Sequence, residues 1–201
     1  MGRQQLLASL RTSVSDERVL AAVAQVPREL FVAPALRRFA YADRPLPIGG
    51  GQTISQPTLV ARMCEMLELS DDDLVLDVGS GSGYHAALLS RLSRYVYGIE
   101  LDEELAAQAA RSLELAGIDN ATVVAGDGSA GLPERAPFDA INVAATAHGE
   151  VPPALEEQLA VGGRLIAPVA YEGTEHLVLV RRLRDGLQRT LLDAVRFVPL
   201  R

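Results

Sequence analysis

Three glycines at alternate positions give the strongest chemical signal in this sequence. The stretch Asp77-Val-Gly79-Ser-Gly81-Ser-Gly83 directly follows a short apolar run and directly precedes a helical pattern. Because glycine has no side chain, a turn of this kind lets the backbone pass close to a bulky ligand. Together with Ala86 the stretch fits the G-x-G-x-x-A fingerprint of dinucleotide sites, so the glycines alone leave NAD and other adenosine cofactors open.

Acidic residues follow the next two apolar runs. Glu100 ends the first of them, where an acid receives the hydroxyls of a ribose in open α/β sheets. Asp127-Gly128 follows the second, and Asp127 can accept a hydrogen bond from an exocyclic amine such as that of adenine. The plain alternatives are a solvated strand-end carboxylate and an ordinary Asp-Gly turn. Because the carboxyl ends of parallel strands meet at one edge of a sheet, the three motifs together predict a ligand site.

Composition excludes several other kinds of chemistry. The 201 residues carry 26 acidic and 19 basic side chains, and the net charge of −7 disfavours nonspecific nucleic-acid binding. All the basic residues are arginine, which excludes Schiff-base, P-loop and kinase-type lysines. The three histidines, His85, His148 and His176, have no metal-binding spacing, so no metal site is predicted.

The remaining composition indicates a globular protein of the cytoplasm. The only cysteine is Cys64, which excludes an internal disulfide and fits a reducing compartment. No apolar run reaches the roughly 18 residues that a transmembrane helix needs. The apolar stretch near the N-terminus is broken early by Arg11, so we do not expect it to be a signal peptide.

Strand and helix patterns alternate through the last two thirds of the chain. Strands are predicted over 74–78, 95–100, 121–125, 138–144 and 164–169, and helices over 84–92, 102–116 and 152–159. The C-terminal part predicts two strands, 177–183 and 191–199, around Asp185-Gly186. We therefore expect an α/β fold with a doubly wound, mostly parallel sheet that ends in an antiparallel hairpin, while the order of the last two strands stays open.

The first third predicts helices and a long loop over the site. Helices are expected over 15–26, with Ser15 as the cap, over 28–32 and over 57–69, with Ser55 placed to cap the last. The loop over 33–57 contains three consecutive glycines, and long ordered loops are often functional. We treat 1–201 as a single domain with an N-terminal segment, 1–69, that forms part of the site, and a cofactor-binding core, 70–201.

With an aspartate before the first glycine and an acid-glycine pair after the third strand, the sequence resembles the S-adenosylmethionine-dependent methyltransferases. Longer segments resemble one of their families, the protein-L-isoaspartate O-methyltransferases, from about residue 15 to the end. These segments are 27–32 (PRELFV), 41–48 (YADRPLPI), 51–57 (GQTISQP), 136–141 (APFDAI), 151–155 (VPPAL), 162–168 (GGRLIAP) and 195–200 (VRFVPL). The resemblance implies a Rossmann-like methyltransferase fold.

The resemblance also implies a repair reaction. The family methylates the free α-carboxylate of L-isoaspartyl residues in damaged proteins or peptides, and the ester then closes to a succinimide. The implied catalytic residue is Ser55, and the implied cofactor is S-adenosyl-L-methionine. The residues expected at the cofactor are Thr53, Ile54, Asp77, Gly79, Gly81, Glu100, Asp127 and Gly128. A monomer that acts on isoaspartyl substrates without nucleic acid or membrane is expected.

Elementary chemistry is compatible with so sparse a site. A free α-carboxylate has a pKa of about 3.5, so it is already a nucleophile at neutral pH and needs alignment more than a general base. By pattern alone, a helix N-cap is the better explanation of Ser55 than a catalytic role, although the two roles need not exclude each other. A carboxylate methyltransferase for a dedicated peptide or small molecule, and a noncatalytic nucleotide-binding module, stay open. One departure is Arg201, which stands where the family usually has a threonine.

Overall fold

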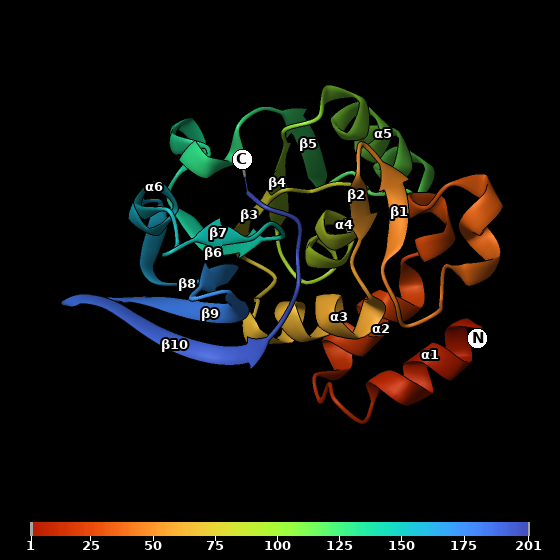
Figure 1. The fold of residues 1–201 in the computed structure, drawn as a ribbon, viewed down its shortest axis with the longest axis horizontal. Helices are drawn as coiled ribbons and strands as arrows, with labels where there is room; N and C mark the ends of the chain where they lie inside the picture. The colour runs from red at the N-terminus through yellow and green to blue at the C-terminus, as the bar shows by residue number, and fades with distance from the viewer. Residues whose placement is uncertain (1, 201) are drawn as a thin grey trace.

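The computed structural model describes residues 2–200. A central sheet runs through the molecule, with strands in the order β10-β9-β8-β6-β3-β4-β5 (Figure 1). Their bounds are β3 (Leu74–Val78), β4 (Tyr95–Glu100), β5 (Ala121–Ala125), β6 (Phe138–Val143), β8 (Leu159–Tyr171), β9 (Thr174–Leu183) and β10 (Gly186–Ala194). Strands β3, β4, β5, β6 and β8 pair in parallel, and β8, β9 and β10 pair antiparallel. The doubly wound, mostly parallel sheet is confirmed, and β10 lies at its edge.

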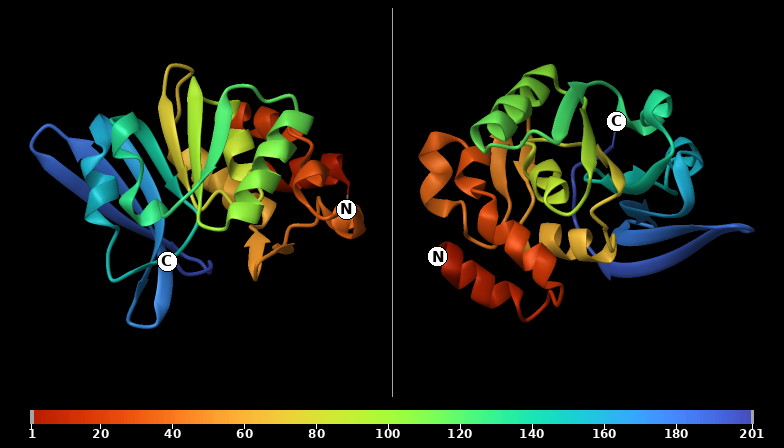
Figure 2. Two further views of the ribbon diagram at one scale, coloured as in Figure 1. Left: turned by 90° about the horizontal axis from the view of Figure 1, so that it is seen from above. Right: turned by 180° about the vertical axis from the view of Figure 1, so that it is seen from behind.

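Helices cover both faces of this sheet. The first five helices lie on one side, as Figure 2 shows, and the short α6 lies on the other. The helices are α1 (Arg3–Leu10), α2 (Glu17–Gln25), α3 (Pro57–Met66), α4 (Tyr84–Ser90), α5 (Glu103–Leu115) and α6 (Pro153–Glu157). Short 3-10 helices span Arg28–Phe31, Pro34–Phe39, Gly128–Ala130 and Pro133–Arg135. No helix within residues 2–200 is both long and apolar enough to cross a membrane.

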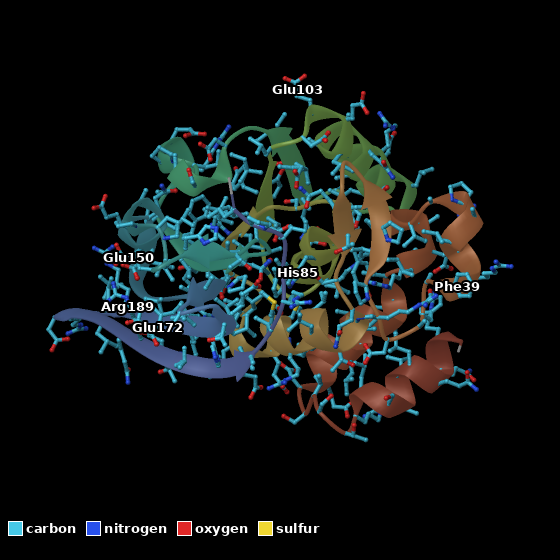
Figure 3. The ribbon with its side chains drawn as sticks, viewed as in Figure 1. Phe39, His85, Glu103, Glu150, Glu172 and Arg189 are labelled. Atoms are coloured by element: carbon cyan, nitrogen blue, oxygen red, sulfur yellow. The ribbon has the colours of Figure 1, made fainter. Side chains whose placement is uncertain are left out.

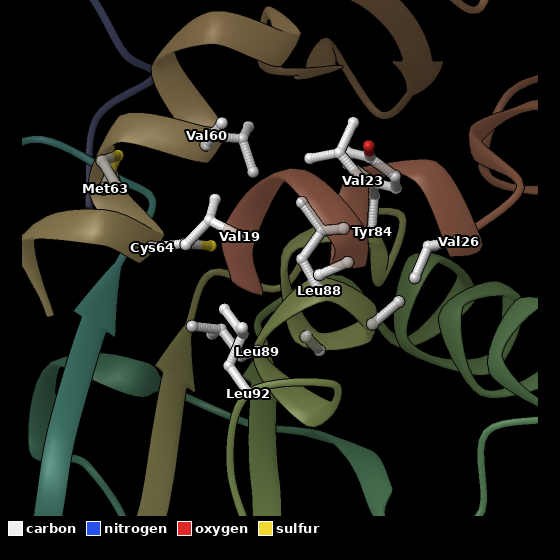
Figure 4. Close-up of a cluster of buried hydrophobic side chains, with 14 of the residues drawn as sticks. Val19, Val23, Val26, Val60, Met63, Cys64, Tyr84, Leu88, Leu89 and Leu92 are labelled. Atoms are coloured by element: carbon white, nitrogen blue, oxygen red, sulfur yellow. The ribbon is translucent and has the colours of Figure 1, made fainter. Parts of the chain in front are cut away.

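The larger core cluster joins the N-terminal helices to the sheet. Val19 and Val23 of α2, Met63 of α3 and Leu88 and Leu89 of α4 meet in one buried group (Figure 4). Burying these apolar side chains fixes α2 and α3 against the helix that follows the glycine turn. The N-terminal third is thereby part of the same core as the sheet.

The chain order of the strands places the site. From β3 the chain runs outward to β4 and β5 and then returns to β6 on the other side of β3. This reversal between β3 and β6 is a switch point, where open α/β sheets bind ligands beyond the carboxyl ends of their strands. The glycine turn begins at the end of β3 and is therefore at that point.

Several local predictions were wrong in their details. The cap of α2 is Asp16, which accepts from the amide of Arg18 at 2.7 Å, whereas Ser15 binds the Glu65 carboxylate. The stretch expected as a loop over 33–57 contains a 3-10 helix and a hairpin of β1 (Leu46–Gly49) and β2 (Gln52–Ile54). Helix α1 was not predicted, and the last strand runs over 186–194 and not over 191–199.

Ser55 does not cap α3. The cap position is Gln56, because Pro57 is the first helical residue, and the Gln56 side chain makes no cap bond. Asp43 takes that role from a distance in sequence: its carboxylate accepts from the amide and the hydroxyl of Thr58, at 2.9 and 2.8 Å. Ser55 therefore does not make the capping hydrogen bond that its spacing predicted.

Candidate active site

A pocket opens at the carboxyl edge of β3 and β4, between the glycine turn and the β1–β2 hairpin. Its wall comes from six stretches of the chain that are far apart in sequence. The lining residues are Ile48, Gln52–Ser55, Val60, Val78–Ser82, Tyr84, His85, Ile99–Leu101, Gly128, Ala144, Ala145 and Val198–Leu200. Of the residues predicted to contact a cofactor, Thr53, Ile54, Gly79, Gly81, Glu100 and Gly128 are on this wall, and Ser55 is there as well.

The glycine turn is shaped by backbone conformations that other residues adopt only under strain. Gly79 and Gly81 have φ of +75° and +54°. A Cβ on Gly81 would stand 3.2 Å from the Ile48 side chain of the hairpin, and one on Gly128 would stand 2.6 Å from Val78. The pocket therefore depends on glycine both for the path of its turn and for the room inside it.

Glu100 is held by the backbone on both sides. One carboxylate oxygen accepts from the amide of Gly81 at 2.8 Å, and the other accepts from the amide of Asp102 at 3.1 Å. The side chain is only 6% exposed, yet it forms part of the pocket wall. A carboxylate oxygen has more than one lone pair, so Glu100 retains acceptor capacity for a pair of hydroxyls.

Asp77 and Asp127 do not line the pocket. Asp77 is fully buried beneath the glycine turn, where burial raises the pKa of its carboxyl to about 6. Asp127 is exposed, and its carboxylate accepts from the amide of Ser129 at 2.9 Å, which lowers its pKa. Their predicted contacts with a cofactor stay predictions, and in this structure Asp127 fixes the backbone beside Gly128 while Asp77 accepts from the Asn142 side chain.

His85 belongs to the buried helix that follows the glycine turn. It lies near the centre of the molecule at the start of α4 (Figure 3) and is 7% exposed. Its Nδ1 is 3.1 Å from the amide nitrogen of Asn142, which donates to Asp77 at 2.6 Å. Sequence patterns could not bring these three together, because the contact depends on the pairing of β3 with β6.

Ser55 stands where the pocket meets a second cleft. Thr53, Ser55, Ala144 and Val198 line both spaces, and the second one continues along α3 and the segment after β10. Beyond the shared residues, the cleft is lined by Pro45, Gln56, Thr58, Leu59, Arg62, Leu177 and Asp193–Phe197. A group that reaches Ser55 from this cleft meets the pocket at the same point.

Arg28 holds the loop that carries Ser55. Its guanidinium is fully buried, donates to the carbonyl of Ser55 at 2.7 Å and to that of Ala40 at 2.8 Å, and lies 4.5 Å from the ring centre of Tyr84. Burial lowers the pKa of Arg28. The PRELFV segment contains this arginine, but no spacing rule pointed to its contact with Ser55.

The last described residues close the pocket from the side of β7 (Ala147–His148). Thr146 donates its amide to the carbonyl of Val198 at 2.7 Å and accepts from the amide of Leu200 at 2.8 Å. Glu175 binds the Thr146 hydroxyl and the Phe197 amide, both at 2.8 Å. These bonds fix the segment along the pocket edge, and Arg201, the predicted departure, lies outside the described residues.

Comparison with known proteins identifies the family. Residues 1–201 match the family "Protein-L-isoaspartate(D-aspartate) O-methyltransferase (PCMT)". The chain belongs to this family. A protein-L-isoaspartate O-methyltransferase of Roseiflexus castenholzii is 53% identical over 191 residues, which cover 95% of this chain and 87% of that one. One of Methanothrix thermoacetophila is 47% identical over 203 residues, covering 100% of this chain and 95% of its own.

Solved structures of the isoaspartate methyltransferase family have the same fold. One protein-L-isoaspartate O-methyltransferase matches with a TM-score of 0.88 and 32% identity. The match covers 98% of this chain but only 65% of the other chain. A Plasmodium falciparum protein described by the same activity, in complex with S-adenosyl-L-homocysteine, matches with a TM-score of 0.86 and 29% identity, covering 100% and 99% of the two chains. The Rossmann-like methyltransferase fold is therefore confirmed.

The pocket of this isoaspartate methyltransferase homologue fits S-adenosylmethionine. The glycine turn leaves room that a single Cβ would reduce, the fixed carboxylate of Glu100 can accept from ribose hydroxyls, and Ile99 and Leu101 offer apolar surface for a base. Two wall residues have a buried polar atom without a partner within residues 2–200, the hydroxyl of Tyr84 and Nε2 of His85.

Proposed function

We propose that this protein transfers a methyl group from S-adenosylmethionine to the free α-carboxylate of L-isoaspartyl residues in damaged proteins and peptides. The observation that carries the proposal is the position of Ser55 on the wall shared by the pocket and the second cleft. The membership of the family and the names of its relatives support the choice of substrate. Methylation of that carboxylate starts repair through a succinimide.

The chain's own residues have little proton chemistry to perform. When bound, S-adenosylmethionine supplies a methyl group on a positively charged sulfur. Ser55 offers a hydroxyl that makes no hydrogen bond within the described residues, so it is free to orient a substrate carboxylate. A neutral donor holds the carboxylate in line and leaves its charge in place. An arginine at the same position would neutralise that charge.

The covering segments exclude water from the reaction. The β1–β2 hairpin packs Ile48 against Gly81, and Val198–Leu200 closes the opposite edge. Arg28 fixes the backbone at Ser55, so the hydroxyl is placed by a buried side chain and not by a loop alone. Exclusion of water strengthens every electrostatic contact in the site.

We assign the site residues in two groups. Ser55 contacts the substrate, and the cofactor contacts are Thr53, Ile54, Gly79, Gly81, Glu100 and Gly128. Asp77 accepts from Asn142 beneath the glycine turn, and Asp127 accepts from the Ser129 amide next to Gly128, both outside the wall. We further infer that residues 1–201 form one domain, because α1–α3 share the larger core with the sheet.

We also infer a cytoplasmic monomer that works without nucleic acid. The net charge of −7 supports the last point, since phosphate contacts require basic surface. The buried, unpaired thiol of Cys64 supports a reducing compartment. Gel filtration with light scattering at several protein concentrations tests the monomer.

A matched peptide pair tests the proposed activity. Two peptides of one sequence, differing only in an isoaspartyl or an aspartyl linkage, are incubated with the protein and S-adenosylmethionine labelled in the methyl group. We expect base-labile label in the isoaspartyl peptide alone. Equal labelling of both peptides, or of neither while S-adenosylhomocysteine still binds, would contradict the assignment.

A further inference from the structure

Three polar side chains form a buried chain under the glycine turn. Asp77 of β3 and Asn142 of β6 are register partners, both are fully buried, and the Asn142 amide nitrogen donates to Asp77 at 2.6 Å. The same nitrogen is 3.1 Å from Nδ1 of His85. Burying three polar groups is unfavourable unless their hydrogen bonds are satisfied, and within residues 2–200 Asp77 Oδ2, Asn142 Oδ1 and His85 Nε2 have no partner.

The chain determines which ring nitrogen of His85 carries the proton. An amide nitrogen is only a donor, and the Asp77 carboxylate, as an acceptor, fixes the amide in this orientation. Nδ1 of His85 must therefore accept, which places the proton of the neutral ring on Nε2. Burial lowers the pKa of His85 to about 3, so the ring stays neutral at physiological pH.

Nε2 of His85 is thus a fixed donor without a partner in residues 2–200. His85 is part of the pocket wall together with its neighbours Tyr84, Gly79 and Ala145. His85 thus contributes to the wall of the cofactor pocket, and its covered Nε2–H group has no acceptor among residues 2–200, so an acceptor brought by a ligand would satisfy it.

The position of His85 indicates which end of the cofactor it meets. Glu100 marks the ribose end, and Ser55 marks the place where the methyl group is transferred. If the amino-acid end extends from the sulfur away from Glu100, it runs toward the β6 side of the turn, where His85 contacts Asn142. Among the described residues of the wall, Glu100 has the only charged side chain, so no arginine there offers a charge to a carboxylate.

We propose that His85 donates its Nε2–H to the carboxylate at the amino-acid end of S-adenosylmethionine, with Asn142 and Asp77 as positioning residues that fix the tautomer. The inference rests on the proposed function for its cofactor. A neutral donor suits this position, because a nearby cation would also attract the substrate carboxylate and hold it away from the methyl group.

Binding of two cofactor fragments tests this assignment without any turnover. S-Adenosylhomocysteine has the amino-acid end, and 5′-methylthioadenosine lacks it, so calorimetry with both ligands isolates that end. His85→Leu should weaken S-adenosylhomocysteine about tenfold, the size expected for a lost hydrogen bond to a charged group, and leave methylthioadenosine unchanged. His85→Gln, whose amide still donates, should keep most of the affinity.

A measurement on the unmodified protein covers the case in which His85→Leu does not fold. The chain has only three histidines, so long-range proton–nitrogen spectra can follow each ring. Nε2 of His85 should be protonated from about pH 5 to pH 8, and its resonance should move on addition of S-adenosylhomocysteine but not of methylthioadenosine.

Each contrary result has a distinct meaning. Equal losses for both ligands in His85→Leu would show a packing effect, and unchanged binding of both would show no contact; either overturns the assignment. A raised KM for the peptide with unchanged cofactor binding would place the donor on the substrate carboxylate and overturn it too. Because no peptide enters the binding experiments, failure of the proposed activity would leave their result intact.

Discussion

Two backbone amides hold the Glu100 carboxylate in place, so the acceptor for the ribose is fixed before any ligand arrives. Glu100→Ala should weaken S-adenosylhomocysteine by about 1–3 kcal/mol, the range for hydrogen bonds that involve a charged group. Calorimetry measures the change. Glu103→Ala is the matched control, since it removes an exposed acid nearby on α5 that is absent from the pocket wall (Figure 3). Equal effects of the two changes would show a long-range charge effect and not a contact.

The catalytic role of Ser55 can be tested by mutation without a simultaneous loss of a helix cap. Because it makes no cap bond, Ser55→Ala should leave the melting temperature and S-adenosylhomocysteine affinity nearly unchanged while methyl transfer to an isoaspartyl peptide falls substantially. Thr58→Ala is the control: it removes the hydroxyl bonded to Asp43 and should lower stability by about 1 kcal/mol. A fully active Ser55→Ala protein would remove the residue from the catalytic assignment.

At the scale of elements, two variants separate the two effects of adding a side chain to the glycine turn, backbone strain and loss of space. Gly81→Ala introduces a Cβ at φ of +54° and 3.2 Å from Ile48, whereas Gly117→Ala after α5 has a similar φ of +66° and nothing within 4 Å. Both should lose about 1–2 kcal/mol of stability from the left-handed backbone. Only Gly81→Ala should also weaken S-adenosylhomocysteine in calorimetry. If both variants bind it like the unmodified protein, the pocket does not need the space at Gly81.

The elements also show how far sequence patterns reach. Strands β3 to β6 were predictable because buried parallel strands are short apolar runs between turn residues. The β1–β2 hairpin was not, because its prolines and glycines resemble a loop and its pairing depends on contacts with the rest of the chain. The start of α3 at residue 57 was predicted, but the cap position directly before it is Gln56 and not Ser55, and only the folded chain brings Asp43 to that start.

Residues of the site were likewise predictable where a local pattern fixes their position, and not where a long-range contact does. Glu100 and Gly81 were predicted because their positions follow from one strand and one turn. The contacts of Arg28 with Ser55 and of His85 with Asn142 join residues 27 and 57 positions apart, and no local pattern carries such a separation. Long-range polar contacts therefore had to come from the structure.

At the scale of the whole molecule, the buried acid under the glycine turn makes stability depend on pH. Burial raises the pKa of Asp77 from 3.8 to about 6, although the Asn142 hydrogen bond lowers it, and the charge of Glu100 raises it further. The unfolded chain therefore loses this proton at lower pH than the folded protein does. The resulting penalty is absent below about pH 4, grows between the two pKa values and is complete above pH 6, where it reaches about 3 kcal/mol.

Asp77→Asn removes this titration while keeping an oxygen that accepts from Asn142. In urea unfolding of the ligand-free protein, the variant should gain stability relative to the unmodified chain at pH 7, and the gain should fall by roughly half at pH 5. His85, whose pKa burial lowers, destabilises both proteins alike as the pH falls below 6.5, so its contribution cancels in the difference. A difference that stays constant between pH 5 and pH 7 would show that Asp77 does not titrate there.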